Sequence, residues 1–162
     1  MEQIHLDKMQ QTGMTIMIFV EGTILNPKSW LTLYHHRSYV PTQNSVEMIK
    51  SWYKQGANIV YCTSRRNKQA YDIASLLKQY GFVGSKLCYR SRGEKYKQIV
   101  EAIEPAILIE DDAKSIGGAW QRCITYVSPE IKKNITSIIV PEFKGIAHLS
   151  LDINLLKTPI TR

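Results

Sequence analysis

The 162-residue chain has 44% hydrophobic and 22% charged residues, which is typical of one globular domain with a core of its own. No apolar run approaches the roughly 18 residues that a membrane-spanning helix needs, and the first residues lack the apolar segment of a secretion signal. The sequence therefore predicts a cytoplasmic protein that does not enter a membrane, with residues 1–13 as a polar lead-in and residues 14–162 as a single domain.

The predicted elements alternate between short apolar strands and amphipathic helices. Such alternation is typical of βαβ units, so we expect an α/β domain of the three-layer, Rossmann-like kind with a mainly parallel central sheet. In chain order we expect a strand at 15–20, a helix at 41–55, a strand at 58–63, a helix at 68–80, a strand at 86–90, a helix at 94–103, a strand at 106–109, weaker strands at 123–127 and 136–140, and a last helix at 149–156.

Polar residues directly follow the three strongest strands. In parallel sheets the ligand site lies beyond the carboxyl ends of the strands, so we expect these residues to converge on one crevice. They are Glu21-Gly22-Thr23, Thr63-Ser64-Arg65 and Glu110-Asp111-Asp112.

Four segments in this order resemble the motifs of the haloacid dehalogenase (HAD) superfamily. They read IMIFVEGTIL, NIVYCTSR, GEKYK and AILIEDDAKSIGG, each beside the expected element. The resemblance implies a HAD-like fold, shared with a superfamily composed mostly of magnesium-dependent phosphatases and phosphotransferases. Only about 17 residues separate Ile24 from Pro41, which is too few for a cap domain, so the resemblance is to a small capless member with an open site.

The resemblance also implies roles for single residues. The sequence Glu-Gly-Thr fixes the register of the first motif, and Phe19 then stands where the family has its nucleophilic aspartate. The implied roles are general acid or base for Glu21, a hydrogen bond to the phosphoryl group for Thr63, charge neutralisation for Lys97 or else Lys95, and magnesium binding for Asp111 and Asp112.

Phe19 is the severe departure from the family pattern. Phosphoryl transfer through a covalent intermediate needs an ionised oxygen in line with phosphorus, and a phenyl ring has none. The same position is a magnesium ligand in the family, so a magnesium site would be weakened. We therefore expect the aspartate-nucleophile activity to be lost and the protein to act as a binding or regulatory module. An anion-accepting crevice for a phosphate-bearing ligand would use Gly22, Thr23, Ser64, Arg65 and Lys95.

Three other interpretations stay open at this point. The polar residues would fill only structural roles if the crevice is a relic, with Arg65 and Lys97 paired to Asp111 and Asp112. A metal-dependent phosphohydrolase would use Glu21 as the base on a water molecule beside a metal on Asp111 and Asp112. A nucleic-acid-binding protein would use the region 65–97, where nine basic residues face two acidic ones, although no nucleic-acid-binding motif is present.

Overall fold

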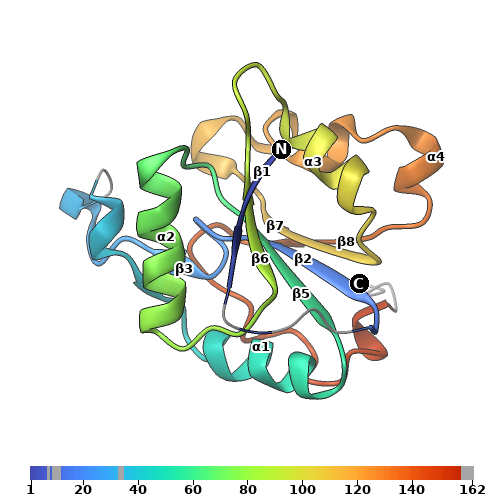
Figure 1. Cartoon of the computed structure of the whole chain (residues 1–162), viewed down its shortest axis with the longest axis horizontal. Helices are drawn as coiled ribbons and strands as arrows, with labels where there is room; N and C mark the ends of the chain where they lie inside the picture. The colour runs from blue at the N-terminus through green and yellow to red at the C-terminus, as the bar shows by residue number, and fades with distance from the viewer. Residues whose placement is uncertain (7, 9–11, 33–34, 158–162) are drawn as a thin grey trace.

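A six-stranded sheet lies at the centre of the computed structural model, which describes residues 1–6, 8, 12–32 and 35–157 (Figure 1). The strand order is β1-β6-β5-β2-β7-β8. Five strands run parallel, and β1 pairs antiparallel with β6 at one edge. The strands are β1 (Glu2–His5), β2 (Thr15–Phe19), β5 (Asn58–Cys62), β6 (Lys86–Tyr89), β7 (Ile107–Asp111) and β8 (Thr136–Val140), and a separate pair consists of β3 (Leu25–Asn26) and β4 (Val40–Pro41).

Helices cover both faces of this sheet and give the expected three-layer α/β architecture. Helices α1 (Ser45–Lys54) and α2 (Lys68–Gln79) lie on one face, and α3 (Tyr96–Ile103) and α4 (Pro129–Lys132) lie on the other (Figure 1). The remaining turns are 3₁₀ helices: η1 (Trp30–Thr32), η2 (His36–Ser38), η3 (Lys114–Ile116), η4 (Gly118–Trp120), η5 (Cys123–Tyr126) and η6 (Leu155–Lys157).

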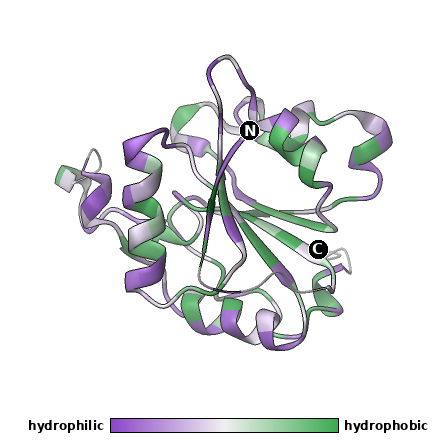
Figure 2. Cartoon of the chain, in the orientation of Figure 1, coloured by the Kyte–Doolittle hydropathy of each residue, from purple (hydrophilic) through white to green (hydrophobic). Residues whose placement is uncertain are grey.

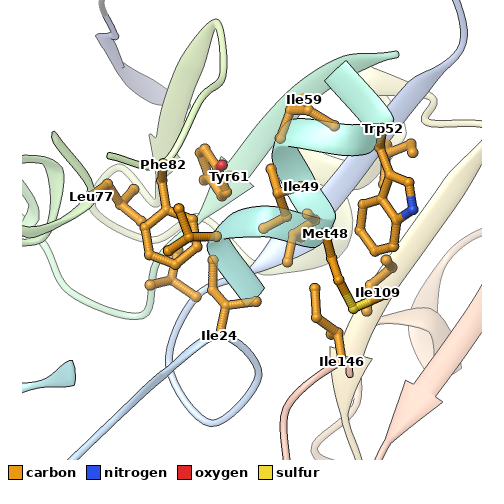
Figure 3. Close-up of a cluster of buried hydrophobic side chains, with 14 of the residues drawn as sticks. Ile24, Met48, Ile49, Trp52, Ile59, Tyr61, Leu77, Phe82, Ile109 and Ile146 are labelled. Atoms are coloured by element: carbon orange, nitrogen blue, oxygen red, sulfur yellow. The ribbon is translucent and has the colours of Figure 1, made fainter. Parts of the chain in front are cut away.

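The larger core lies between the sheet and the layer of α1 and α2. Successive strand residues point to opposite faces, so alternate residues such as Ile59 and Tyr61 enter this core. Trp52 and Ile49 of α1 meet them there, as Figure 3 shows. The strands in Figure 2 are largely hydrophobic, as expected for parallel strands covered on both faces.

The smaller core lies under α3 and η5. It contains the other strand residues, including Met17 and Leu108, together with Ile99 and Val100 of α3. All three cysteines of the sequence, Cys62, Cys88 and Cys123, belong to this core and are free thiols. No helix among the described residues has the length and the apolar character needed to cross a membrane.

Two predicted elements are wrong near the carboxyl end of the chain. Residues 123–127 do not form a strand, because the backbone N–H groups of Cys123 and Ile124 donate to the side chain of Glu110 and η5 forms instead. Residues 149–156 do not form a helix, and only η6 is helical there. Polar side chains of α1 and of its C-cap residue bind this tail: Trp52 Nε1 donates to the carbonyl of Ser150 at 3.0 Å, and Gln55 Nε2 donates to that of Leu151 at 2.7 Å.

Two boundaries near the amino end also differ from the prediction. Residues 2–5 are not a lead-in outside the domain, because β1 pairs with β6 over its full length, from Glu2 opposite Tyr89 to His5 opposite Lys86. The first helix begins at Ser45 rather than at residue 41, because Pro41 pairs with Leu25 in the small β3–β4 sheet. The predicted strands 15–20, 58–63, 86–90, 106–109 and 136–140 are confirmed within two residues.

Candidate functional site

A crevice of about 320 Å³ opens at the carboxyl ends of β2, β5 and β7. The chain proceeds from β2 to β5 and β6 on one side and then to β7 and β8 on the other, so the crevice lies at the point where the strand order reverses. Its walls include one or more residues from each predicted polar cluster: Glu21, Gly22, Ser64, Arg65, Glu110 and Asp111. The predicted convergence of the three strand ends is therefore present in the structure.

Phe19 lies at the end of β2 and lines this crevice with a half-buried ring. The ring packs edge-on against Tyr96, with the ring centroids 5.3 Å apart and an interplanar angle of 74°. The guanidinium of Arg90 lies 4.0 Å from the centroid of the Tyr96 ring, which places a cation over its face. The position that the family resemblance assigns to the nucleophile is therefore occupied by an aromatic stack.

The carboxylate of Glu21 is bound by the loop that follows β5. Thr63 Oγ1 donates a hydrogen bond to Glu21 Oε1, and the backbone N–H of Ser64 donates to Oε2 at 3.1 Å. Arg65 Nε lies 3.9 Å from Glu21 Oε1, so Arg65 pairs with Glu21 and not with Asp111 or Asp112. Both oxygens of this candidate acid or base therefore already accept a hydrogen bond from the protein.

Three carboxylates gather on the β7 and β8 side of the crevice. Asp111, Asp112 and Glu142 each offer an oxygen, and these oxygens lie within 4.8 Å of one another. Burial raises the pKa of Asp111, and the nearby charges of Glu142 and Asp112 raise it further. The trio is therefore a set of hard oxygen ligands that repel one another when no cation lies between them.

Sequence analysis missed Glu142, although the signal that found Asp111 applies to it equally. Glu142 follows β8 by two residues, as Asp112 follows β7 by one. Its carboxylate oxygens accept hydrogen bonds from the N–H and the hydroxyl of Ser115, at 2.9 and 2.7 Å. The prediction considered only the residues after the three strongest strands, and the same rule applied to β8 would have included Glu142.

The oxygen trio fits magnesium in the chemistry of its donors. Magnesium prefers carboxylate and water oxygens and usually keeps several of its waters. Gly22 approaches the trio closely: its φ is +79°, and a Cβ at this position would come within 2.8 Å of Asp111 Oδ2. Glycine at this turn therefore leaves room for the Asp111 carboxylate beside the β2 loop.

Glu110 is a second carboxylate that the prediction did not assign a role. It is buried, and it accepts the backbone N–H groups of Cys123 at 2.7 Å and Ile124 at 3.0 Å. Burial raises its pKa, while these two hydrogen bonds and the charge of Arg122 oppose the rise. Glu110 therefore joins β7 to η5 and fixes the wall of the crevice.

Five predicted site residues lie outside the crevice wall, and one of them, Asp112, lies beside it in the carboxylate trio. Thr23 and Thr63 are fully buried behind this wall. Lys95 and Lys97 line an adjoining groove that shares Ser64, Tyr96 and Gln121 with the crevice. Whether the resemblance assigns the site lysine to Lys97 or to Lys95, that lysine lines the groove and not the crevice.

The described residues make the floor of the crevice acidic. Glu21, Glu110, Asp111 and Glu142 line it, against the guanidinium groups of Arg65 and Arg122. An anion placed here meets more negative than positive side chains, which disfavours its binding to these residues alone.

The described residues between Ile24 and Pro41 contain the short elements β3, η1, η2 and the start of β4, and no α-helix. Among the described residues of this segment, Tyr39 lies on the crevice wall, and its hydroxyl lies 3.5 Å from Arg65 Nη2. The crevice is therefore accessible from solvent.

Comparison with known proteins bears on the fold. No family model and no curated protein matches the sequence. A chain in the structure of the Pnkp1/Rnl/Hen1 RNA repair complex is similar with a TM-score of 0.54 and 13% identity, over 83% of this chain and 45% of that one. A chain in a second structure of the Pnkp1/Rnl/Hen1 complex gives 0.52 and 14%, over 85% and 50%.

A universal stress protein in complex with cAMP is more distant, with a TM-score of 0.38 and 10% identity over 80% of this chain and 95% of that one. The chain spans about half the length of the two Pnkp1/Rnl/Hen1 chains that it matches. At these identities the similarity concerns architecture alone, and together with the sheet topology it identifies the fold as a three-layer, Rossmann-like α/β domain.

Proposed function

We propose that this chain is a HAD-like domain that binds a phosphate-bearing ligand in the crevice and has lost the formation of a covalent aspartyl-phosphate. One observation carries the proposal: the ring of Phe19 lines the crevice at the end of β2, where the resemblance requires a carboxylate. A phenyl ring cannot attack phosphorus, and it cannot ligate a metal.

Binding would be divided between the two sides of the crevice. Asp111, Asp112 and Glu142 would hold a divalent cation, which when bound supplies the positive charge that attracts phosphate oxygens. Arg65 stands on the opposite wall, where its pairing with Glu21 at 3.9 Å is loose enough to leave the guanidinium able to bind phosphate. The acidic floor explains why we expect metal and phosphate to bind together.

Titration calorimetry tests this proposal with magnesium chloride and inorganic phosphate as probes. We expect phosphate to bind only after magnesium, and Asp111→Asn to abolish both events. Glu47→Gln, which removes an exposed carboxylate on α1, is the matched control and should change neither. Phosphate binding of equal strength without any divalent cation would overturn the cation-dependent arrangement.

A metal-dependent hydrolase that uses no protein nucleophile is the second candidate. The oxygen trio favours it, because a metal held by Asp111, Asp112 and Glu142 lowers the pKa of a bound water. Glu21 would then serve as the base, although both of its oxygens are already hydrogen-bonded. Magnesium-dependent turnover of an aryl phosphate that Asp111→Asn and Glu21→Gln both abolish would establish this candidate in place of the binding module.

A further inference from the structure

A second hollow, here called the groove, adjoins the crevice and has a volume of about 730 Å³. Two parts of the chain contribute different chemistry to it. The segment from Arg90 into α3 contributes the cations of Arg90, Lys95 and Lys97, and η4 and η5, here called its aromatic side, contribute the rings of Trp120 and Tyr126. The groove is thus positive and aromatic, whereas the floor of the crevice is acidic.

The cations of the groove are not neutralised by the protein. Among the described residues no carboxylate forms an ion pair with Arg90, Lys95 or Lys97. The nearest acid in the sequence, Glu94, is already bound by the amino group of Met1 at 2.9 Å and by the backbone N–H of Ser91 at 2.8 Å. The groove therefore presents positive charge to whatever enters it.

Its aromatic side is exposed and yet braced. Trp120 is 74% exposed and Tyr126 is 51% exposed, which is unusual for rings of this size. The Tyr126 hydroxyl donates to the carbonyl of Trp120 at 2.7 Å, and Thr125 Oγ1 donates to that of Ala119 at 2.7 Å. Glu110 holds the start of η5 through two backbone N–H groups. These bonds fix the backbone that carries Trp120 and the hydroxyl end of the Tyr126 ring before any ligand arrives.

Cations without a carboxylate partner, together with exposed rings, fit one class of ligand in particular. Single-stranded nucleic acid presents phosphates to the cations and flat bases to the rings, and base–aromatic stacking adds affinity without sequence preference. An acidic peptide would satisfy the cations but offers no flat faces in a regular series.

We propose that the groove binds single-stranded nucleic acid, with bases stacked on Trp120 and Tyr126 and the backbone on Arg90, Lys95 and Lys97. The groove adjoins the crevice through five shared lining residues, so a strand lying in the groove can extend one end into the crevice: Ser64, Tyr96, Ile116, Gln121 and Cys123. This inference deepens the proposed function and rests on it for one point, namely that the phosphate entering the crevice is the terminal phosphate of a strand.

A third hollow extends the basic surface of the groove on the side away from the crevice. This hollow of about 410 Å³ shares Arg90 with the groove and adds Arg66 and Arg92, although Glu2 also lines it. Part of the basic region 65–97 is thereby assembled along one path, while Lys68 and Lys78 lie on α2, outside these hollows.

The test is fluorescence anisotropy of labelled oligonucleotides of about 12 nucleotides, in RNA and DNA versions of the same sequence. We expect binding that weakens steeply with salt. Trp120→Ala should weaken it about tenfold, and Lys97→Glu should weaken it and lower the salt slope by at least about one unit. Leu151→Ala and Lys54→Glu, an exposed leucine and an exposed lysine outside the groove, are the matched controls and should leave affinity unchanged.

The absence of binding at low salt would overturn the inference, and so would binding by Trp120→Ala as tight as that of the unmodified protein. Equal affinity for a poly-glutamate peptide of the same charge would do so as well, because stacking would then contribute nothing. The crevice is tested separately with oligonucleotides phosphorylated at either end. We expect magnesium to favour one phosphorylated end, and Asp111→Asn to remove that preference while groove binding persists. Groove binding with no effect of a terminal phosphate would contradict only the link to the crevice.

Discussion

Phe19 combines two properties that a substitution can separate. Its ring packs against Tyr96 at the smaller core, and it occupies the end of β2 beside the acidic floor. Packing favours the aromatic ring, whereas phosphoryl chemistry would require a carboxylate at the same place.

Phe19→Asp should therefore gain chemistry and lose stability. We expect magnesium-dependent binding of beryllium fluoride, measured by titration calorimetry, because a carboxylate would then stand opposite Asp111. We also expect a loss of about 1–3 kcal/mol in the free energy of unfolding, since ring contacts are lost and a charge is added to an acidic site.

Phe19→Asn is the matched control, because the asparagine side chain has nearly the same shape as the aspartate of Phe19→Asp but carries no charge. It should lose stability in urea denaturation without gaining any affinity for beryllium fluoride. Tight binding of beryllium fluoride by the unmodified protein would mean that another carboxylate is the acceptor, and the role assigned to Phe19 would be wrong.

The cysteines give a second prediction at the residue scale. Burial raises the pKa of Cys88 to about 11 and raises the pKa of Cys62 well above its ordinary value. Since the thiolate is the reactive form, we expect all three thiols to react slowly with a disulfide reagent near pH 8 and much faster after unfolding. Titration with Ellman's reagent, with and without denaturant, measures this, and rapid labelling of the folded protein would contradict it.

At the scale of elements, Glu110 connects a strand of the sheet to the aromatic side of the groove. Replacing one carboxylate oxygen by an amide in Glu110→Gln puts an NH₂ group against a backbone N–H donor. We expect the free energy of unfolding to fall by about 1–3 kcal/mol and residues 118–126 to exchange their amide hydrogens faster.

Glu101→Gln provides the comparison for Glu110→Gln. Glu101 Oε1 accepts a single backbone hydrogen bond, from Ser128 at 2.8 Å, so its amide can keep that bond. Hydrogen exchange of residues 118–126 should be unchanged in this variant. Equal acceleration in both variants would show that Glu110 has no special role in holding the rings.

The elements also show what the sequence could predict and what it could not. The five parallel strands could be predicted from their apolar runs. A strand that is covered on both faces is apolar along its length, and this local pattern is enough to recognise it. The run at 123–127 looks the same but loses its backbone donors to Glu110, a partner thirteen residues away. Strand β1 is polar and has no apolar run, so it is recognised as a strand only from its pairing with β6 in the structure.

The residues of the candidate site were predictable where they directly follow a recognised strand, and not where their position depends on turns. Strand ends identified Glu21, Arg65 and Asp111, because topology alone brings them together. The position of Lys97 depends on how α3 begins, and the exposure of Trp120 depends on the turns after β7, so neither follows from local pattern. The aromatic side of the groove could therefore not be predicted from the sequence before the fold was known.

At the scale of the whole molecule, the tail after β8 completes the larger core. Ile146, Leu149, Ile153 and Leu156 are buried against α1 and the sheet. The backbone N–H of Ile153 also donates to Gln55 Oε1 at 3.3 Å, which adds to the two bonds from Trp52 and Gln55. The tail is thus part of the domain although it has little regular structure.

Truncating the buried tail side chains should be costly. We expect Leu149→Ala and Ile153→Ala each to lower the free energy of unfolding by about 2–4 kcal/mol, through lost burial and the cavities that remain. Leu151→Ala is the control within the same tail, because Leu151 is 56% exposed, and it should stay within about 0.5 kcal/mol. Urea denaturation measures all three, and equal values for Leu149→Ala and Leu151→Ala would contradict the packing of the tail.

This late-arriving tail has a consequence for biosynthesis. The hydrophobic layer over α1 cannot close until residues 146–156 have left the ribosome, although most of the sheet is made much earlier. A nascent chain lacking this segment would present an open apolar surface to solvent or to a chaperone. Closure of the larger core therefore waits for residues 146–156, in whatever order the rest of the sheet forms.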